Sequence, residues 1–375
     1  MAYVVAALLA SFAVTLLAIR LNLGNPEAHR RYVVRRRAAW IRQPALRGLS
    51  RAGGIGVAAG LLVSLVARTL DDAVAAPIAA RMGLLLLLCA LPVFVAGLVE
   101  DFHQGLGIGL RFAAALTSAA LGGWFLDAWV VRLDSGPFDA AIAAIPAVSI
   151  VFTCFAVAGL TNAFNLIDGF NGLAGGVATL ILIGIAYVAF KVGDIAIMAS
   201  ALTAVGAIAG FMALNFPRGL IFLGDGGAYL VGFWIAELLV LLVARNPQVS
   251  AWFPILVCSY PISETLFSIY RRTVVRRAHP GVPDVAHLHH LIYKRLVRWL
   301  IGTRLSAHRL QRNAMTAPYL WVVTSVGVAP AIIFWDRTPV LILGSAVFAA
   351  AYVYGYVRIA KFRAPHWWII RKSKP

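Results

Sequence analysis

Apolar runs long enough to cross a lipid bilayer recur along this chain of 375 residues, and they limit what it can fold into. A bilayer core about 30 Å thick needs roughly 20 apolar helical residues, and backbone groups in lipid must pair within helices or a closed barrel. Hydrophobic residues make up 61% of the chain and charged residues 13%. The runs cover residues 3–19, 53–69, 82–99, 112–131, 140–160, 174–190, 197–214, 226–244, 252–270, 316–335 and 339–357. The sequence therefore predicts an all-α, polytopic transmembrane bundle of about eleven helices, with residues 1–375 as a single membrane domain.

Positive charge is distributed unevenly between the segments that join these runs. If residue 1 faces outward, the outward segments hold six of the 33 Lys and Arg residues and the inward segments hold the other 27. Cytoplasmic loops of membrane proteins carry such an excess, and there the +18 net charge of the chain meets anionic lipid headgroups. We therefore predict an N-terminus outside the cell. Topology accounts for the basic charge without a nucleic-acid partner.

The inward segment 159–176, GLTNAFNLIDGFNGLAGG, places polar side chains between two apolar runs. Asn162, Asn165 and Asp168 are spaced three residues apart, so on a helix they lie roughly on one face and can converge on one ligand. An unpartnered carboxylate at membrane depth is costly, and the glycines that follow allow a close backbone approach. We interpret the segment as a binding site, with a polar interhelical loop as the alternative.

Three further acids lie in inward segments. Glu100 and Asp101 are adjacent at the end of the third apolar run, and Asp225 is flanked by glycines in Phe222-Leu-Gly-Asp-Gly. Adjacent carboxylates repel each other, so the pair favours a nearby cation, either a metal ion or basic groups that hold phosphate. A solvated helix end for the pair, and a simple Asp-Gly turn for Asp225, are the alternatives.

The longest inward loop holds three histidines within four residues, namely His287, His289 and His290, and basic residues follow them. Zinc sites use other ligand spacings, so the cluster favours an anionic phosphate over a metal, with a solvated cluster as the alternative. An earlier basic loop ends at Arg51 and a glycine-rich stretch. That loop could bind phosphate through charge and exposed amides, or could act only as a topology signal.

These acids and histidines all lie on one predicted membrane face. Carboxylates gather a divalent cation and cations gather phosphates, so the set suits phosphoryl transfer between a lipid phosphate and a cytosolic phosphorylated donor. Glu264, near the end of the ninth run, is excluded from this set. It precedes Arg271 and Arg272 by two helical turns, which favours an internal salt bridge.

In the order and spacing of these motifs, residues 45–300 resemble the polyprenyl-phosphate N-acetylhexosamine-1-phosphate transferases, which include the phospho-N-acetylmuramoyl-pentapeptide transferase. The matching motifs are Arg51-Ala-Gly-Gly, Glu100-Asp101, Asn162-x-x-Asn165-x-x-Asp168-Gly, Phe222-x-Gly-Asp225 and His287-x-His289-His290. The resemblance implies ten or eleven helices and a cytoplasmic active site in the bacterial inner membrane. It also implies transfer of a sugar 1-phosphate from a UDP-sugar to undecaprenyl phosphate, with release of UMP.

The resemblance also implies a role for each motif. Asp225, with Asp168, would bind magnesium, or manganese as an alternative. Phe222 would stack on uracil, for which its flat ring is suited. The remaining residues divide into those that contact substrate (Asn162, Asn165 and Arg51), those that position or deprotonate the prenyl phosphate (Glu100 and Asp101), and those that offset pyrophosphate charge (His287, His289 and His290).

Two positions depart from the family pattern. Many members have an Asp-Asp pair where this chain has Glu100 before Asp101, and a second Asp where this chain has Asn171. An amide cannot act as a base or balance charge, so Asn171 is not expected to be catalytic.

Three possible functions of this chain can be distinguished by its sequence. Members that transfer phospho-N-acetylmuramoyl-pentapeptide tend to have three contiguous histidines, whereas Leu288 interrupts them here. This favours a free UDP-N-acetylhexosamine donor, for O-antigen or capsule-type glycans, with peptidoglycan synthesis as the alternative. A transporter is a remote alternative, because Asp127 and Glu237 lie within predicted runs, where single acids more often pair locally. Surrounding membrane lipid and a homodimeric partner complete the predicted contacts.

Overall fold

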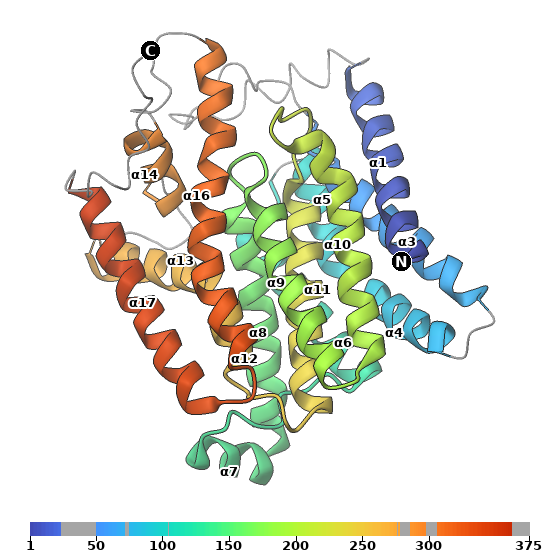
Figure 1. The fold of residues 1–375 in the computed structure, drawn as a ribbon, viewed down its shortest axis with the longest axis vertical. Coiled ribbons are helices and arrows are strands. Elements are labelled where there is room, and N and C mark those ends of the chain that lie inside the picture. Colours follow the sequence, from blue (N-terminus) through green and yellow to red (C-terminus); the bar gives the residue numbers. More distant parts are fainter. Residues whose placement is uncertain are drawn as a thin grey trace.

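The protein is a bundle of helices. The computed structural model describes residues 1–23, 50–71, 75–103, 105–275, 277, 286–297 and 306–361, and over these residues the chain forms helices and no strand (Figure 1). Most of the basic loop before Arg51, and residues 278–285 and 298–305 of the histidine loop, lie outside the described residues. Eight described helices are long and apolar enough to cross a membrane, or nine if one bent pair is a single span. The predicted class, a polytopic membrane bundle, is confirmed.

The helices follow the predicted runs closely in most of the chain. In order they are α1 (Ala2–Leu23), α3 (Gly53–Thr69), α4 (Ala75–Cys89), α5 (Leu91–His103), α6 (Ile108–Leu126), α7 (Gly136–Ala144), α8 (Pro146–Ile167), α9 (Leu173–Lys191), α10 (Ile195–Asn215), α11 (Gly224–Arg245), α12 (Phe253–Val257), α13 (Ser259–Tyr270), the π-helical η2 (Arg271–Val275), α14 (Leu288–Arg295), α16 (Ser306–Ile333) and α17 (Thr338–Ala360).

Three predicted runs differ from the structure. The run 140–160 is divided between α7 and α8, because Pro146 occupies the first position of α8 and favours a helix start there. The run 252–270 forms α12 and α13, neither of which is long enough to span a membrane. The run 82–99 crosses from α4 to α5 at a bend of 47°, and Pro92 in the first turn of α5 lacks the amide that would continue the helix.

Helix α11 is the centre of the bundle. Within its apolar window 89% of residues are buried, and it packs against α3, α5, α6, α8 and α9. In Figure 1, α16 and α17 lie to one side of it, and α1, α3 and α4 lie to the other. Because α11 is covered on all sides, its first turn is placed by the neighbouring helices.

Glycines bring three backbones into direct contact at the start of α11. A Cβ atom on Gly54 of α3 would lie 2.4 Å from the Cα of Gly227, and one on Gly97 of α5 would lie 2.4 Å from the Cα of Gly226. Only small residues let membrane helices approach this closely. The contacts fix α3 and α5 against the first turn of α11.

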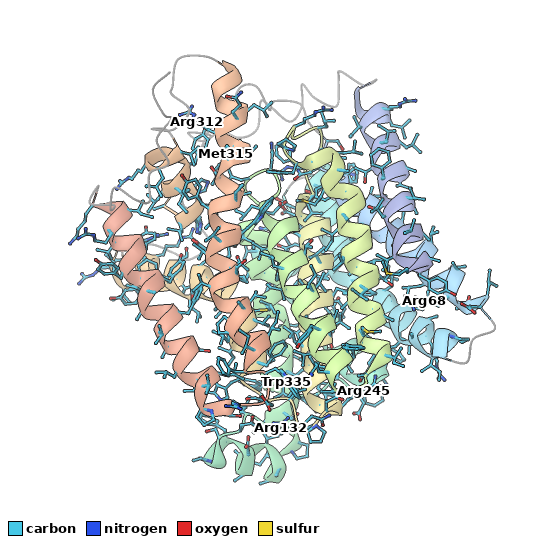
Figure 2. All side chains as sticks on the ribbon, viewed as in Figure 1. Arg68, Arg132, Arg245, Arg312, Met315 and Trp335 are labelled. Carbon is cyan, nitrogen blue, oxygen red and sulfur yellow. The ribbon has the colours of Figure 1, made fainter. Side chains whose placement is uncertain are left out.

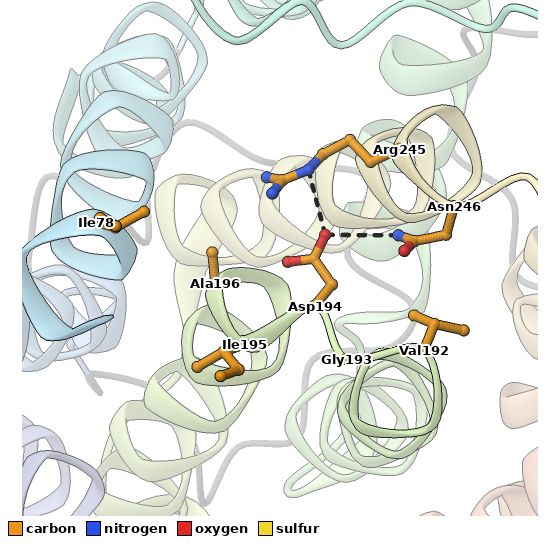
Figure 3. A pocket seen from close by; sticks show the side chains of 8 residues that line it. All are labelled: Ile78, Val192, Gly193, Asp194, Ile195, Ala196, Arg245 and Asn246. Carbon is orange, nitrogen blue, oxygen red and sulfur yellow. Dashed lines mark hydrogen bonds and ion pairs between the residues drawn. The ribbon is translucent and has the colours of Figure 1, made fainter. Parts of the chain in front are cut away.

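The two ends of the bundle differ in chemistry. Figure 2 shows Arg312 and Met315 at one end, near α14, and Arg132, Arg245 and Trp335 at the other. The second end has a hollow of about 400 Å³ where Asp194 caps α10 (Figure 3). Its one lining carboxylate pairs with Arg245 Nε at 3.2 Å, and Asn246 donates to it at 3.5 Å. Among the described residues, this hollow therefore offers no group of acids, and the predicted site residues lie elsewhere.

Candidate active site

The start of α11 is joined to the start of α3 through backbone hydrogen bonds. The amide of Phe222 donates to Ser50 O at 2.9 Å, and the amide of Gly53 donates to Phe222 O at 3.0 Å. Gly224 then has φ +80°, a conformation that favours glycine, and a Cβ there would lie 2.1 Å from Arg51 O. This junction places Arg51 beside the residue that follows, Asp225.

Asp101 of α5 caps α11 from outside. Its Oδ1 accepts from the amide of Asp225 at 3.0 Å, and its Oδ2 accepts from the amide of Gly226 at 2.9 Å. The first amides of a helix lack partners within the helix, and negative charge at that end is favoured by the helix dipole. Asp101, with its side chain 1% exposed, therefore fixes the backbone that carries Asp225.

Two arginines surround the carboxylate of Asp225. Arg111 Nη1 lies 3.0 Å from Asp225 Oδ2, and Arg51 Nη1 lies 3.9 Å from Asp225 Oδ1 and 3.7 Å from Asp101 Oδ1. The Asp225 side chain keeps 18% exposure, so a ligand can reach it. Sequence reasoning missed Arg111. The available signal was its place as the sole basic Lys or Arg of the short inward segment 100–111.

Asp168 follows the last residue of α8 and belongs to the same electrostatic group. Burial raises its pKa to about 7. Arg51 opposes this shift, Asp225 and Asp101 add to it, and the amide of Gly224 again opposes it. The structure thus brings together the three aspartates predicted from separate segments. A carboxyl held among like charges gains from a bound cation.

The other predicted residues of this region have more local contacts. Asn165 hydrogen-bonds to the Tyr229 hydroxyl, whereas Asn162 Nδ2 donates to Ala158 O in its own helix at 2.8 Å. Glu100 Oε2 accepts from two loop amides, at 3.0 and 2.9 Å, and so shapes residues 105–106. The Phe222 side chain is half-buried. Glu100 therefore has a structural task that its neighbour Asp101 does not share.

The three histidines form one cluster beside Asp168. Ring centroids of His289 and His290 are 4.3 Å apart, and those of His287 and His289 are 5.3 Å apart in a stacked arrangement. A Cβ on Gly169 would lie 3.3 Å from His289 Nε2. Phe170 contacts the rings of both His289 and His290. The start of α14 and the end of α8 therefore meet at one site.

The histidines are not equivalent. Burial lowers the pKa of His289 well below its usual range, and the neighbouring His290 and His287 lower it further. A neutral ring can donate or accept a hydrogen bond but cannot offset phosphate charge as a cation. His289 is thus poorly suited to that predicted role.

Two neighbouring polar residues have contacts that helical spacing did not predict. The salt bridge expected between Glu264 and Arg271 or Arg272 is wrong, because Glu264 Oε1 pairs with His287 Nδ1 at 2.9 Å. Asn171 is fully buried; its side-chain Nδ2 donates to Pro217 O at 3.4 Å, and its backbone N–H donates to Asn313 Oδ1 at 2.8 Å. Sequence reasoning missed Glu264 because its partner is 23 residues away in the chain.

The acid group fits a magnesium ion completed by substrate. Over the described residues, no group of three or more His, Cys, Asp or Glu side chains is arranged to hold a metal. Magnesium, however, keeps several waters and is commonly bound by one or two carboxylates together with substrate phosphates. Asp225 and Asp168 provide two such carboxylates. Burial is the main cause of the raised pKa of Asp168, but Asp225 and Asp101 add to it, and a cation beside the group would relieve that repulsion.

Comparison with known proteins agrees with this site. Residues 83–243, which include all three aspartates, match the sequence profile of glycosyl transferase family 4. The chain is 31% identical over 218 residues to a probable undecaprenyl-phosphate N-acetylglucosaminyl 1-phosphate transferase of Bacillus subtilis, covering 57% of this chain and 58% of that protein. It is 28% identical to the undecaprenyl-phosphate alpha-N-acetylglucosaminyl 1-phosphate transferase of Thermotoga maritima, covering 56% and 62%.

A third relative extends the match. The chain is 28% identical over 284 residues to the decaprenyl-phosphate N-acetylglucosaminephosphotransferase of Mycolicibacterium smegmatis, covering 70% of this chain and 66% of that protein. In all three comparisons the match spans less than two thirds of the relative's own length. The resemblance drawn from the motifs is nevertheless confirmed by the glycosyl transferase family 4 match over residues 83–243 and by these relatives.

Proposed function

We propose that this protein transfers N-acetylglucosamine 1-phosphate from UDP-N-acetylglucosamine to undecaprenyl phosphate and releases UMP. The observation that carries the proposal is the grouping of Asp101, Asp168 and Asp225 with Arg51 at the start of α11. The names of the relatives support both the polyprenyl phosphate acceptor and the N-acetylglucosamine donor. The product would begin a cell-surface glycan of the O-antigen or capsule type.

The reaction exchanges one phosphoanhydride for another. An oxygen of the acceptor phosphate attacks the phosphorus attached to the sugar, and the bond from that phosphorus to the bridging oxygen breaks, so UMP leaves with the electron pair. A phosphate monoester has a second pKa near 6, so the acceptor is largely ionised at cytosolic pH. A strong general base is then hardly needed, and positioning and electrostatics should dominate.

Each residue has a role in this scheme. Asp225 and Asp168 would hold magnesium, or manganese as an alternative, which when bound neutralises charge on the pyrophosphate. Arg51 lies 3.7 to 3.9 Å from the carboxylates, which supports a role in contacting a phosphate that approaches them. Phe222 would stack on uracil, and Asn165 would hold the nucleoside. The histidine cluster would bind the leaving phosphate.

The membrane placement is part of the proposal. The protein crosses the membrane several times. We infer that it lies in the bacterial inner membrane, with the start of α11 and α14 facing the cytoplasm and residue 1 outside, because that orientation follows the positive-inside rule. A homodimer stays a prediction.

Two alternatives are weaker. Transfer of phospho-N-acetylmuramoyl-pentapeptide uses the same chemistry, but the relatives are named for N-acetylglucosamine. For a transporter, Glu237 would be the intramembrane acid of interest. It is buried in α11 without a hydrogen-bond partner among the described residues, contrary to the local pairing expected, whereas Asp127 ends α6. Glu237 lies about 18 Å along the helix from Asp225, apart from the acid group.

The test is an assay in detergent micelles with magnesium, undecaprenyl phosphate and a panel of UDP-sugars, following UMP release and labelled lipid. Asp225→Asn is the control variant. Turnover with UDP-N-acetylglucosamine that the variant loses would support the proposal. Turnover only with UDP-N-acetylmuramoyl-pentapeptide would move the protein to the peptidoglycan reaction, and no turnover with any donor in a folded preparation would overturn the proposal.

A further inference from the structure

A buried carboxylate lies where α13, α14 and α17 meet. Glu264 of α13 is 1% exposed. One of its oxygens lies 2.9 Å from His287 Nδ1, and the other accepts from the Tyr352 hydroxyl of α17 at 2.8 Å. The amide of Leu288, the first residue of α14, lies 3.2 Å from both oxygens. Three hydrogen-bonding groups therefore converge on the Glu264 carboxylate: one from α17, one from the first residue of α14, and one from the residue before α14.

The residue before His287 is held as well. Arg271 donates to Ala286 O and contacts the Tyr356 hydroxyl, and that hydroxyl donates to Ala286 O at 2.7 Å. The Arg271 guanidinium also lies 5.2 Å from the Tyr356 ring centroid. Residues 286–288 are thus fixed from both sides, with the carbonyl of Ala286 bound by α17 and η2.

The pairing with Glu264 determines how His287 can act. A carboxylate only accepts, so His287 Nδ1 carries a hydrogen, and Nε2 on the other side of the ring is left for a ligand. His287 is stacked on His289 at an interplanar angle of 17°. Because His289 in turn lies against Gly169, the orientation of one ring governs how the cluster meets Asp168.

We propose that Glu264 is a positioning residue of the active site, which orients His287 through Nδ1 and the whole histidine cluster through the start of α14. The inference rests on the proposed function, in which the cluster binds the leaving phosphate. Tyr352 shares the carboxylate but does not touch the histidines in this contact. Tyr352→Phe is therefore a matched control, because it removes one hydrogen bond to the Glu264 carboxylate and leaves the Glu264–His287 contact in place.

The kinetic test uses the full chain and a cycle of Glu264→Gln, His287→Gln and the double variant, with Tyr352→Phe as control. The glutamine keeps the size of the side chain and one acceptor oxygen, so Leu288 N remains bonded. We expect kcat to fall about 10- to 100-fold in Glu264→Gln, with KM for the UDP-sugar changed less than about threefold. Adding Glu264→Gln to the His287→Gln variant should lower kcat little further, because the ring that Glu264 orients is already absent. Tyr352→Phe should stay within about threefold of the unchanged protein.

An effect of Glu264→Gln that is equally large with and without His287 would overturn the proposal and leave a structural role only. So would an unchanged kcat in a variant whose thermal unfolding matches the parent. Glu264→Asp, which restores the charge with a shorter side chain, should recover part of the lost kcat.

A second measurement separates this inference from the proposed function, since it needs no turnover. Histidine labelled with 15N reports which ring nitrogen carries hydrogen, and the His287 signal is assigned by its loss in His287→Gln. A hydrogen on Nδ1 that is lost or shared in Glu264→Gln would support the placement. A bare Nδ1 in the unchanged protein would refute it, even if UMP release were normal. Absence of UMP release with a normal His287 signal would refute the proposed function alone.

Discussion

Replacing Asp101 by Asn tests whether this acid holds the backbone of the site in place as well as taking part in the reaction. From sequence alone, Asp225→Asn is expected to cost far more turnover than Asp101→Asn if Asp101 only removes a proton. The structure changes that expectation, because both carboxylate oxygens of Asp101 bind amides in the first turn of α11. Asparagine offers one acceptor, and its NH2 group would face a backbone N–H.

The magnitude follows from the lost contacts. A hydrogen bond to a charged group contributes about 1.5–3 kcal/mol, and an unsatisfied buried donor costs about 1–3 kcal/mol. Loss of one such bond, at 2.9 or 3.0 Å, together with the weaker attraction of Arg51, should lower stability by about 2–3 kcal/mol. Since about 1.4 kcal/mol corresponds to a tenfold change in rate, turnover should fall about 30- to 150-fold if this free energy is lost at the backbone that carries Asp225.

Asp139→Asn is the matched control. Asp139 also accepts from two backbone amides, those of Leu133 at 2.6 Å and Ser135 at 3.0 Å, but it lies in α7 at the opposite end of the bundle (Figure 1). Thermal unfolding in detergent, followed by tryptophan fluorescence, should show a loss for both variants. UMP release should fall only in Asp101→Asn. An Asp101→Asn protein with the stability and turnover of the parent would refute the reasoning.

Three further predictions concern charge and packing. Arg111 lies 3.0 Å from Asp225 and would compete with magnesium for its carboxylate. In Arg111→Ala the magnesium concentration for half-maximal turnover should therefore fall several-fold, and a rise in that concentration would contradict this competition. Gly97→Ala would place a Cβ 2.4 Å from the backbone of Gly226, so a thermal unfolding scan should show marked destabilisation, whereas an unchanged scan would mean that α5 and α11 can separate. Asp134, at the opposite end, has a pKa held below its usual range, because hydrogen bonds from a backbone amide and an arginine outweigh the opposing effect of burial. It therefore contributes stability above its unfolded pKa of about 3.9 that is lost as pH falls through the lower folded value, and Asp134→Asn should unfold about 1–3 kcal/mol more easily at pH 7 yet keep its turnover.

Much of the fold could be predicted because membrane helices are selected by length and apolarity alone. The run 53–69 coincides with α3 to the residue, since Arg51 lies just before it and Asp71 and Asp72 lie just after it. The errors lie where one apolar stretch contains two helices. Residues 252–270 are apolar enough for a span, and only Ser259 and Pro261 mark the break at Cys258 between α12 and α13.

The candidate site was predictable as a set of residues but not as a set of contacts. Asp101, Asp168 and Asp225 were found because acids are rare in an apolar chain, and the structure groups them. The capping of α11 by Asp101 depends on the close approach of α5. Gly97 permits that approach, but a glycine alone does not predict which helix will pack against it. The partner of Glu264 could not be found by helical spacing, because it comes from a different element.

The glycine contacts at the start of α11 also bear on how the protein would cycle between bound and free states in the proposed reaction. Where backbone meets backbone, as at Gly54 and Gly227, there is no side chain whose rotation could absorb a displacement. The carboxylate side of the site should therefore behave as a fixed platform throughout the cycle. The histidine side stands on separate helices, α13, α14 and α17. We expect nucleotide entry and UMP departure to require displacement of that side, so the speed of product release should respond to changes in α14 and α17 more than to changes in α3 or α5.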